Sequence, residues 1–296
     1  MIRIGLVDLD TSHPKAFTSI LKTMEGIEVT ALCDGHDVWP AGYDAQFARE
    51  NNIPTVCSSP EEMLDHVDAA MIHGVDWDKH ISKALPFIKA GKHVLIDKPL
   101  VGSIADIEKL RALDVAYPSL IFGGSSLRYA EEIKRLKSSV ENIADSATVF
   151  ASGPGDFFSY GIHTTEMLQS LLGAGVKYVE AKPGHASLFV FLTYHNGFTA
   201  VMQWGTVFHE WSASVFSTSG LITAKVDAAN LYAPFLSAFV SFIKGGLKEF
   251  RIGDPLEAVR IHIAAKLSRR EGARIALSEL PEGEGFDGAA FATEYA

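Results

Sequence analysis

The length, composition and charge of the chain already exclude several classes of protein. Its 296 residues are enough for about two domains, and 47% hydrophobic with 21% charged residues is the balance of a globular chain rather than a fibrous or disordered one. Acidic residues outnumber basic ones, 36 against 26, so the field of the molecule repels polyanions, and we expect a small-molecule ligand rather than nucleic acid or a membrane surface.

The first part of the chain alternates short apolar runs with segments of helical periodicity. Six apolar runs read as strands: residues 2–7, 27–33, 53–57, 69–73, 94–96 and 120–124. Between them hydrophobic residues recur at helical spacing, as over residues 17–24, and residues 59–62 have the spacing of a capping box that starts a helix. Apolar strands separated by helices indicate a parallel sheet covered on both faces, so we expect an α/β, doubly wound Rossmann domain over residues 1–124.

The pattern changes near Ala147, where longer runs rich in Val, Phe, Thr and Tyr begin. The uncharged stretch 187–208 has the length of a membrane span, but Asn196-Gly197 interrupts it with a hairpin signal, so we expect two strands. One helix is predicted around residues 167–172, and helical periodicity returns after Phe235. We therefore expect residues 125–296 to form an α+β domain with a large, mainly antiparallel open sheet, which binds substrate and mediates oligomerisation.

The same features predict the setting and the assembly of the protein. Asp8 comes before a signal-peptide core could form, so we expect a cytoplasmic protein. Cys33 and Cys57 lie in apolar runs and are expected to be buried as small hydrophobic residues. An open, Phe-rich sheet face is too large for a soluble monomer to expose, so we expect a homo-oligomer, either a dimer or a tetramer.

Two carboxylates follow the first strand, where a dinucleotide-binding domain normally has a glycine fingerprint. A G-x-G-x-x-G turn lets the backbone approach a pyrophosphate, but the chain reads Asp8-Leu9-Asp10-Thr11-Ser12-His13. The hydroxyls of Thr11 and Ser12 and the backbone N–H groups could still donate to a phosphate. Asp-x-Asp-Thr also resembles the opening motif of haloacid-dehalogenase-type phosphatases, and Asp8, Asp10 and His13 could form a metal site. If the segment is neither a phosphatase motif nor a metal site, it is a polar turn that caps the first helix. We expect no metal.

Asp34 ends the second strand. In a Rossmann domain an acid at this position accepts hydrogen bonds from the adenosine ribose and repels a 2′-phosphate. The position therefore favours NAD over NADP, although an Asp after a strand is also a common turn residue.

One constellation is specific enough to indicate a family. Residues 91–99 read Gly-Lys-His-Val-Leu-Ile-Asp-Lys-Pro, which resembles the signature of the Gfo/Idh/MocA oxidoreductases (glucose-fructose oxidoreductase and inositol dehydrogenase relatives). Further pieces follow in the order of that family: residues 67–72 with His80, Ser-Ser-Leu-Arg-Tyr at 125–129, Gly-Ile-His-Thr-Thr-Glu at 161–166, and the helical run 239–277. The resemblance covers nearly the whole chain, and the missing glycine fingerprint identifies an atypical branch.

The resemblance implies roles for individual residues. Lys98 and His163 would be catalytic. Substrate would meet Arg128, Ser159, Tyr160 and Glu166. The cofactor, NAD with NADP less favoured, would meet Asp8, Leu9, Asp10, Thr11, Ser12, His13, Asp34, His73, Gly74, Asp97 and Lys98.

These residues suit the oxidation of a secondary alcohol of a sugar, polyol or related hydroxy compound. Such a reaction needs a base for the hydroxyl proton, and a position at a helix N-terminus favours the neutral imidazole of His163. Lys98 would stabilise the developing alkoxide. Ser159 stands where relatives usually have an Asp and supplies no charge, so slower or different chemistry is expected. The alternative is a family member without hydride chemistry that acts as a ligand-binding or regulatory protein.

Overall fold

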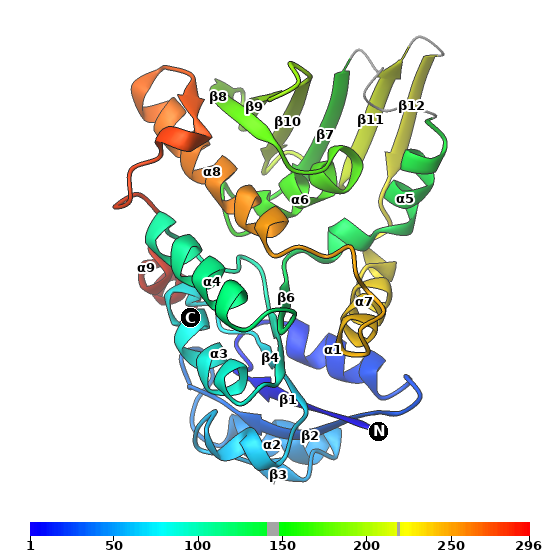
Figure 1. The fold of residues 1–296 in the computed structure, drawn as a ribbon, viewed down its shortest axis with the longest axis vertical. Helices are drawn as coiled ribbons and strands as arrows, with labels where there is room; N and C mark the ends of the chain where they lie inside the picture. The colour runs from blue at the N-terminus through cyan, green and yellow to red at the C-terminus, as the bar shows by residue number, and fades with distance from the viewer. Residues whose placement is uncertain (141–147, 218–219) are drawn as a thin grey trace. The chain divides into compact units, whose positions relative to one another are not determined.

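The computed structural model describes residues 1–140, 148–217 and 220–296, and Figure 1 shows them as a ribbon. The chain divides into two compact units. The first comprises residues 1–123 with 236–252 and 287–296, and the second comprises 124–235 with 253–286. Each unit is described by itself below.

The first unit is built on a six-stranded parallel sheet in the order β3-β2-β1-β4-β5-β6. Its strands are β1 (Ile2–Val7), β2 (Ile27–Cys33), β3 (Thr55–Val56), β4 (Ala69–Ile72), β5 (His93–Ile96) and β6 (Ile121–Gly123). Its helices are α1 (His13–Leu21), α2 (Tyr43–Asn51), α3 (His80–Lys89), α4 (Ile104–Ala116), α9 (Gly288–Tyr295) and most of α7 (Tyr232–Ile243), with the short 3-10 turns η1 (Glu62–Asp65) and η2 (Trp77–Lys79). The predicted Rossmann architecture is confirmed.

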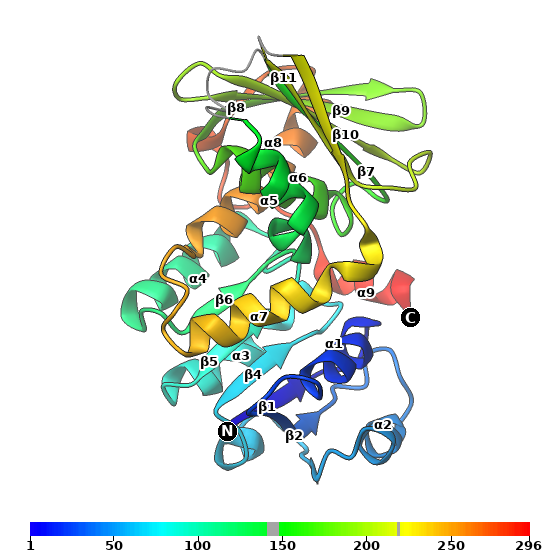
Figure 2. The same cartoon turned by 90° about the vertical axis from the view of Figure 1, so that its right-hand side faces the viewer.

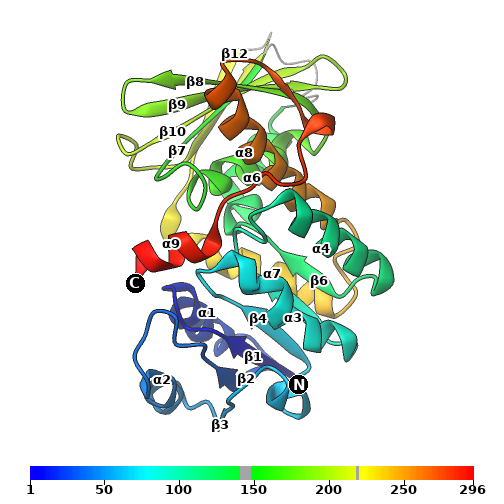
Figure 3. The ribbon, with the colours of Figure 1, turned by 90° about the vertical axis from the view of Figure 1, so that its left-hand side faces the viewer.

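Helices cover both faces of this sheet. Figures 2 and 3 show α1 and α7 on one face and α3 and α4 on the other. Every residue of β4 is buried, as expected for a strand packed on both sides. The order reverses between β1 and β4, and this is the point at which open α/β sheets bind ligands beyond the carboxyl ends of their strands.

Two segments distant in sequence complete the first unit. Residues from Leu236 onward in α7 pack with it, and Phe239 and Phe242 contact Phe122 of β6 with ring centroids 5.5 Å apart in each case. Helix α9 places Phe291 against Trp77. The second domain was expected to span residues 125–296, but residues 236–252 and 287–296 belong to the first unit. The reason is that the apolar faces of α7 and α9 pack against the parallel-sheet unit.

The second unit contains a seven-stranded mixed sheet in the order β12-β11-β7-β10-β9-β8-β13, in which only β7 and β10 pair in parallel. Its strands are β7 (Thr148–Pro154), β8 (Val176–Gly184), β9 (Ser187–Tyr194), β10 (Thr199–Gly205), β11 (Ser212–Ser217), β12 (Gly220–Lys225) and β13 (Ile275–Ala276). Its helices are α5 (Glu131–Ser138), α6 (Gly161–Leu172) and α8 (Gly253–Glu271), with 3-10 turns η3 (Ser126–Tyr129), η5 (Ala228–Asn230) and η6 (Leu277–Glu279). The predicted α+β domain with a mainly antiparallel sheet is confirmed, while Ala147, near which the sequence pattern changes, lies outside the described residues.

Alternate residues of the strands in this unit point into its core. In β9 the even-numbered residues from Leu188 to Tyr194 are buried in the core that also contains Met167 of α6 and Ile261 of α8. The odd-numbered residues, among them Phe191, are only partly covered. The 187–208 stretch folds as β9 and β10, and Gly197 occupies the tight turn between them with φ +85°, as its hairpin signal predicts. In the described part of the chain, no helix is long and apolar enough to cross a membrane.

Candidate active site

In the first unit, the residues that follow β1, β4 and β5 meet at one edge of the sheet. His73 N–H donates to the carbonyl of Val7 at 2.9 Å, and Asp97 N–H donates to Ile72 at 3.0 Å. The predicted cofactor residues Asp8, His73 and Asp97 therefore lie side by side at the switch point, because the carboxyl ends of parallel strands share one edge.

Asp97 is the centre of a buried hydrogen-bonded group. Its Oδ2 accepts from Nδ1 of His13 at 2.6 Å and from Nδ1 of His73 at 3.1 Å, and its Oδ1 accepts from the backbone N–H of Lys98 at 2.8 Å. Burial alone would raise the pKa of Asp97, but the two histidines outweigh it and hold that pKa well below its ordinary value. A charged Asp97 thus anchors the segment that carries Lys98, and burial lowers the pKa of His73.

The two acids of the first turn point inward. Asp8 is 1% exposed, and its Oδ2 lies 2.6 Å from Nζ of Lys83, while its Oδ1 accepts from the N–H of Gly35. Asp10 is 2% exposed and accepts from the N–H of Val75 at 2.9 Å. Burial and the neighbouring Asp8 charge raise the pKa of Asp10 to about 7. Neither carboxylate presents an exposed charge.

This arrangement separates the residues that two of the alternative interpretations need. A metal site would require Asp8, Asp10 and His13 to converge, but His13 turns to Asp97 while Asp8 pairs with Lys83. A phosphatase nucleophile would have to be reached by substrate, and the Asp8 carboxylate is almost fully buried. Asp8 has φ +64°, a conformation that glycine adopts more readily, so it keeps the backbone course of a glycine turn without the glycine.

The turn formed by residues 8–13 would contact a pyrophosphate through other groups than a glycine fingerprint does. Gly74 lies so close to Asp8 that a Cβ there would be 2.7 Å from Oδ2, so the Asp8 carboxylate already occupies the crevice between β1 and β4. The N–H of Leu9 is also engaged, since it donates to Asp34. Ser12 is exposed and Thr11 half-buried just before α1, whereas Pro14 in the first turn of α1 is buried. A phosphate would therefore be held by these hydroxyls and by the helix N-terminus.

Asp34 lies further inside than its predicted role suggests. Its side chain is fully buried, and its Oδ1 accepts the Leu9 N–H at 3.3 Å. Burial raises its pKa. The carboxylate thus ties the end of β2 to the first turn, which sequence position alone could not reveal.

In the second unit, His163 lies in the first turn of α6 and is 7% exposed. Its Nδ1 is 2.6 Å from Oγ of Ser125, and that oxygen also accepts from the N–H of Leu127. The rings of Tyr160 and Trp211 stand edge to face with the imidazole, with centroids 5.9 and 5.6 Å away. The imidazole is therefore fixed by a hydrogen bond and two aromatic contacts.

The other predicted substrate residues are engaged within the same unit. Nε of Arg128 lies 3.0 Å from the fully buried Glu166, and Nη2 of Arg128 donates to Gln169 at 2.8 Å. Burial raises the pKa of Glu166, although Arg128 opposes this. Oγ of Ser159 donates to Asp156 at 2.5 Å.

Sequence reasoning missed two of the residues that contact His163. Ser125 was visible only as part of the Ser-Ser-Leu-Arg-Tyr motif, with nothing to indicate that it binds the imidazole. Trp211 belongs to no motif. It is brought to His163 by the β7 and β11 pairing, which sets Ser212 opposite Ser152, so no sequence signal could have found it.

Comparisons with known proteins agree with the fold of the chain. Residues 2–117 match the model of the oxidoreductase family with an NAD-binding Rossmann fold, GFO_IDH_MocA. YceM of Salmonella typhimurium (strain LT2), which is assigned to the oxidoreductases, is 26% identical over 161 residues. That match covers 52% of this chain and spans about half, 50%, of the relative.

Solved structures share the fold of the whole chain. A probable dehydrogenase from Thermotoga maritima superposes with a TM-score of 0.83 at 19% identity, covering 95% of this chain and 100% of that one. The scyllo-inositol dehydrogenase from Lactobacillus casei, solved with NAD(H) and scyllo-inositol, gives 0.81 at 16% identity, covering 94% and 100%. The expectation of NAD as cofactor is confirmed by the family description. Over residues 2–117 the chain thus matches the NAD-binding Rossmann domain of the Gfo/Idh/MocA oxidoreductase family.

Proposed function

We propose that this protein is an NAD(H)-dependent oxidoreductase that oxidises or reduces a CH–OH group of a sugar, polyol or related hydroxy compound. The observation that carries the proposal is His163, a nearly buried imidazole held through Nδ1 by a 2.6 Å hydrogen bond. A ring fixed in this way suits a proton-transferring group, because proton transfer requires a defined distance and direction.

Ser125 defines how His163 acts in the proposed reaction. When Nδ1 carries hydrogen and donates to the Ser125 oxygen, the neutral ring keeps its lone pair on Nε2 and can take the hydroxyl proton of the substrate there. The nicotinamide supplies the acceptor for the hydride. Ser125 is uncharged, so it orients the ring without the stabilisation of the imidazolium that a carboxylate would give.

Lys98 is the proposed second catalytic residue. Its backbone N–H is bound to the charged Asp97, which fixes the start of its side chain. An ammonium group stabilises negative charge that develops on the reacting oxygen, and it orients the substrate hydroxyl for the proton transfer. Asp97 acts through Lys98 and is therefore a positioning residue.

The cofactor side of the proposal rests on Thr11, Ser12 and the N-terminus of α1. Asp8 is neutralised by Lys83, and the Asp10 carboxyl is partly protonated near pH 7, so the turn carries less negative charge than its sequence indicates. Asp34 is left out of the ribose contact because its side chain is fully buried. The preference for NAD over NADP in this proposal rests instead on the family model, which describes an NAD-binding Rossmann fold.

The test is a screen of polyols and sugars with NAD⁺, followed by absorbance of the reduced nicotinamide. Lys98→Ala should lower kcat by about 10²- to 10³-fold, because it removes the charge that stabilises the alkoxide. Lys109→Ala, on the exposed face of α4, is the matched control and should leave kcat unchanged. An unchanged rate in Lys98→Ala would remove Lys98 from the mechanism.

A second candidate is a ligand-binding or regulatory protein without hydride chemistry. It is favoured by Asp8 and Asp10 in the place of glycines and by the absence of a charge at Ser159. This candidate gains support if no substrate in the screen reduces NAD⁺ and the protein also fails to bind NADH.

A further inference from the structure

A buried ion pair joins η3 to α6 three residues after His163, and the proposed mechanism does not use it. Nε of Arg128 lies 3.0 Å from Oε2 of Glu166, and the two side chains are 11% and 1% exposed. The family resemblance implies that both residues meet substrate, but a carboxylate covered to this degree is not accessible to one. A buried ion pair often stabilises a fold no more than well-packed apolar residues would, so stability alone does not account for it.

The carboxylate of Glu166 supports the backbone turn at Gly124 and Ser125. Gly124 has φ +101°, a conformation that favours glycine, and a Cβ at this residue would be 2.5 Å from Oε2 and 2.9 Å from Oε1 of Glu166. Burial raises the pKa of Glu166, whereas the Arg128 guanidinium and a hydrogen bond from the backbone N–H of Ser125 oppose this. The turn thus lies directly against the carboxylate.

Ser125 connects this turn to the imidazole of His163. Its Oγ lies 2.6 Å from Nδ1 of His163 and also accepts the N–H of Leu127 at 3.1 Å. Ser125 is 0% exposed and His163 is 7% exposed, so water has little access to this bond. A hydrogen bond of this length depends on where the backbone of Ser125 holds the oxygen, and that backbone is the segment that Glu166 supports.

Arg128 holds the same group together from a second direction. Its Nη2 donates to Oε1 of Gln169 at 2.8 Å, and its backbone N–H donates to the carbonyl of Ser125 at 3.2 Å. The guanidinium therefore bonds two residues of α6 at once, Glu166 and Gln169, while its own backbone is tied to the turn. A lysine carries the same charge but does not reproduce this planar, two-sided contact.

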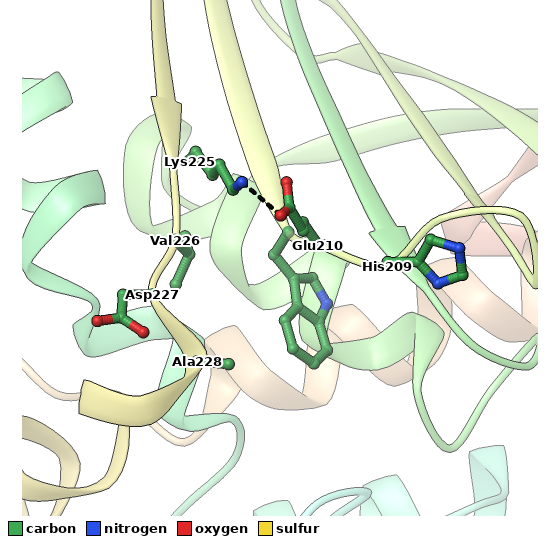
Figure 4. A pocket seen from close by; sticks show the side chains of 7 residues that line it. His209, Glu210, Lys225, Val226, Asp227 and Ala228 are labelled. Carbon is green, nitrogen blue, oxygen red and sulfur yellow. Dashed lines mark ion pairs between the residues drawn. The ribbon is translucent and has the colours of Figure 1, made fainter.

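A second ion pair, on the other side of His163, provides a comparison. The ring of Trp211 stands edge to face with the imidazole at 5.6 Å, and Trp211 belongs to a pocket lined by residues 209–211 and 225–228 (Figure 4). In that pocket Glu210 pairs with Lys225, and the two side chains are 54% and 62% exposed. Glu210 is thus an ion-paired glutamate adjacent to Trp211 that lies on a different segment from the turn at Ser125.

We propose that Glu166 and Arg128 are positioning residues for His163, in place of the substrate contacts that the sequence predicts. They hold the turn that carries Ser125, so that its hydroxyl accepts Nδ1–H and the lone pair of the imidazole remains on Nε2. For the proton transfer to Nε2 the inference rests on the proposed function. The position of the hydrogen on the ring can be measured without substrate or cofactor.

Long-range ¹H–¹⁵N NMR of the full-length protein with ¹⁵N-labelled histidine, at pH 8, reports which ring nitrogen carries hydrogen, and His163→Gln identifies the signal. The wild type should carry it on Nδ1. In Ser125→Ala, which removes the acceptor, and in Glu166→Gln, which leaves Arg128 without its counterion, the signal should shift toward the form with hydrogen on Nε2. Glu210→Gln is the matched control and should leave the signal unchanged.

Arg128→Lys gives the same test if melting temperatures show that Glu166→Gln does not fold. With a substrate from the screen, both variants should lower kcat about 10- to 100-fold while KM changes by less than about twofold, because they misplace the base and not the substrate.

The proposal is overturned if the wild type carries hydrogen on Nε2, or if both variants leave the His163 signal unchanged. It is also overturned if they raise KM at unchanged kcat, which would make Glu166 and Arg128 substrate contacts. Absence of turnover together with the expected NMR shifts would contradict only the proposed function.

Discussion

Asp10 occupies a position where a charged side chain is costly, and this makes its ionisation measurable. It is almost fully buried, its Oδ2 has one backbone donor, and its Oδ1 has no hydrogen-bond partner among the described residues. The groups that face it are Asp8, Lys83 and Asp34, two of which repel a negative charge. Burial together with Asp8 therefore raises the pKa of Asp10 to about 7.

We predict that Asp10 destabilises the protein above neutral pH. A carboxyl whose pKa is higher in the folded than in the unfolded state contributes its full stability below pH 4, and this is lost as the pH rises through 7. Asp10→Asn keeps an acceptor for Val75 N–H and carries no charge. It should be more stable than the wild type at pH 8 by about 1–3 kcal/mol, with a smaller or reversed difference at pH 4.

Urea unfolding of both proteins from pH 4 to pH 8 measures this difference. The other titrating groups are common to the two proteins, so the difference isolates Asp10. A constant difference across the range would show that Asp10 is ionised normally.

Single residues were predictable where a motif carried them. Lys98 and His163 were singled out because they belong to short runs of specific sequence, and their catalytic roles stay predictions. The inward turn of Asp8 and Asp34 was not predictable, because it depends on Lys83 of α3 and on the backbone of Leu9. The contact of Trp211 with His163 depends on strand pairing between segments about 60 residues apart along the chain.

At the scale of elements, His262 joins α8 to α6. Its Nδ1 lies 2.8 Å from the carbonyl of Phe157, which can only accept, so Nδ1 carries hydrogen. Nε2 then accepts from Oγ1 of Thr165 at 2.8 Å. The neutral ring is thus satisfied on both sides, and complete burial lowers the pKa of His262 to about 4.

The two hydrogen bonds of His262 predict that the junction of α6 and α8 loses stability in acid. The folded pKa lies below the unfolded value of 6.5, so the contribution of His262 is complete above pH 6.5 and is lost as the pH falls toward 4. The loss should amount to about 3 kcal/mol. His262→Gln, which can bond to both partners but does not titrate, should lose less stability over this range, as measured by urea unfolding. Parallel losses in the two proteins would contradict the account.

Helices and strands were predicted well where the hydrophobic pattern that indicates them extends over many residues. All six strands of the parallel sheet lie within or near their predicted runs. The capping-box spacing at residues 59–62 produced only the turn η1, because Ser58 and Ser59 exchange hydrogen bonds with Glu62 without a longer apolar stripe to extend the helix. Helix α2 was not predicted, since only two of its nine residues, Phe47 and Ala48, are buried.

At the scale of the whole molecule, one face of the second sheet carries partly covered apolar residues. Phe191, Val201 and Phe150 lie side by side across β9, β10 and β7, and Phe216 on β11 is 41% exposed. The helices α6 and α8 pack against the opposite side. A contiguous apolar strip of this kind is typical of an interface, and we propose that it joins copies of this chain.

Sedimentation velocity tests this proposal. The wild type should sediment at no less than twice the mass of one chain. Val201→Glu, which places a charge in the middle of the strip, should shift it toward the monomer, whereas Lys134→Glu on the exposed side of α5 should not. A monomeric wild type would contradict the proposed assembly.

The division of the chain into domains was predictable only in part. The expected boundary at residue 124 lies one residue beyond Gly123, where β6 ends, but the two segments 236–252 and 287–296 return to the first unit. Their helical periodicity was visible in the sequence, whereas the partner of their apolar faces was not, because periodicity reports that a face is buried and not against what.

The central claim is that a Rossmann domain without a glycine fingerprint still binds a nicotinamide dinucleotide. A titration of the full-length protein with NADH, followed by energy transfer from tryptophan to the nicotinamide and checked by calorimetry, tests it most directly. We predict binding of one NADH per chain in the micromolar range, with NADPH weaker. Absence of binding of NAD⁺, NADH and NADPH at millimolar concentration would contradict the claim and favour the ligand-binding alternative.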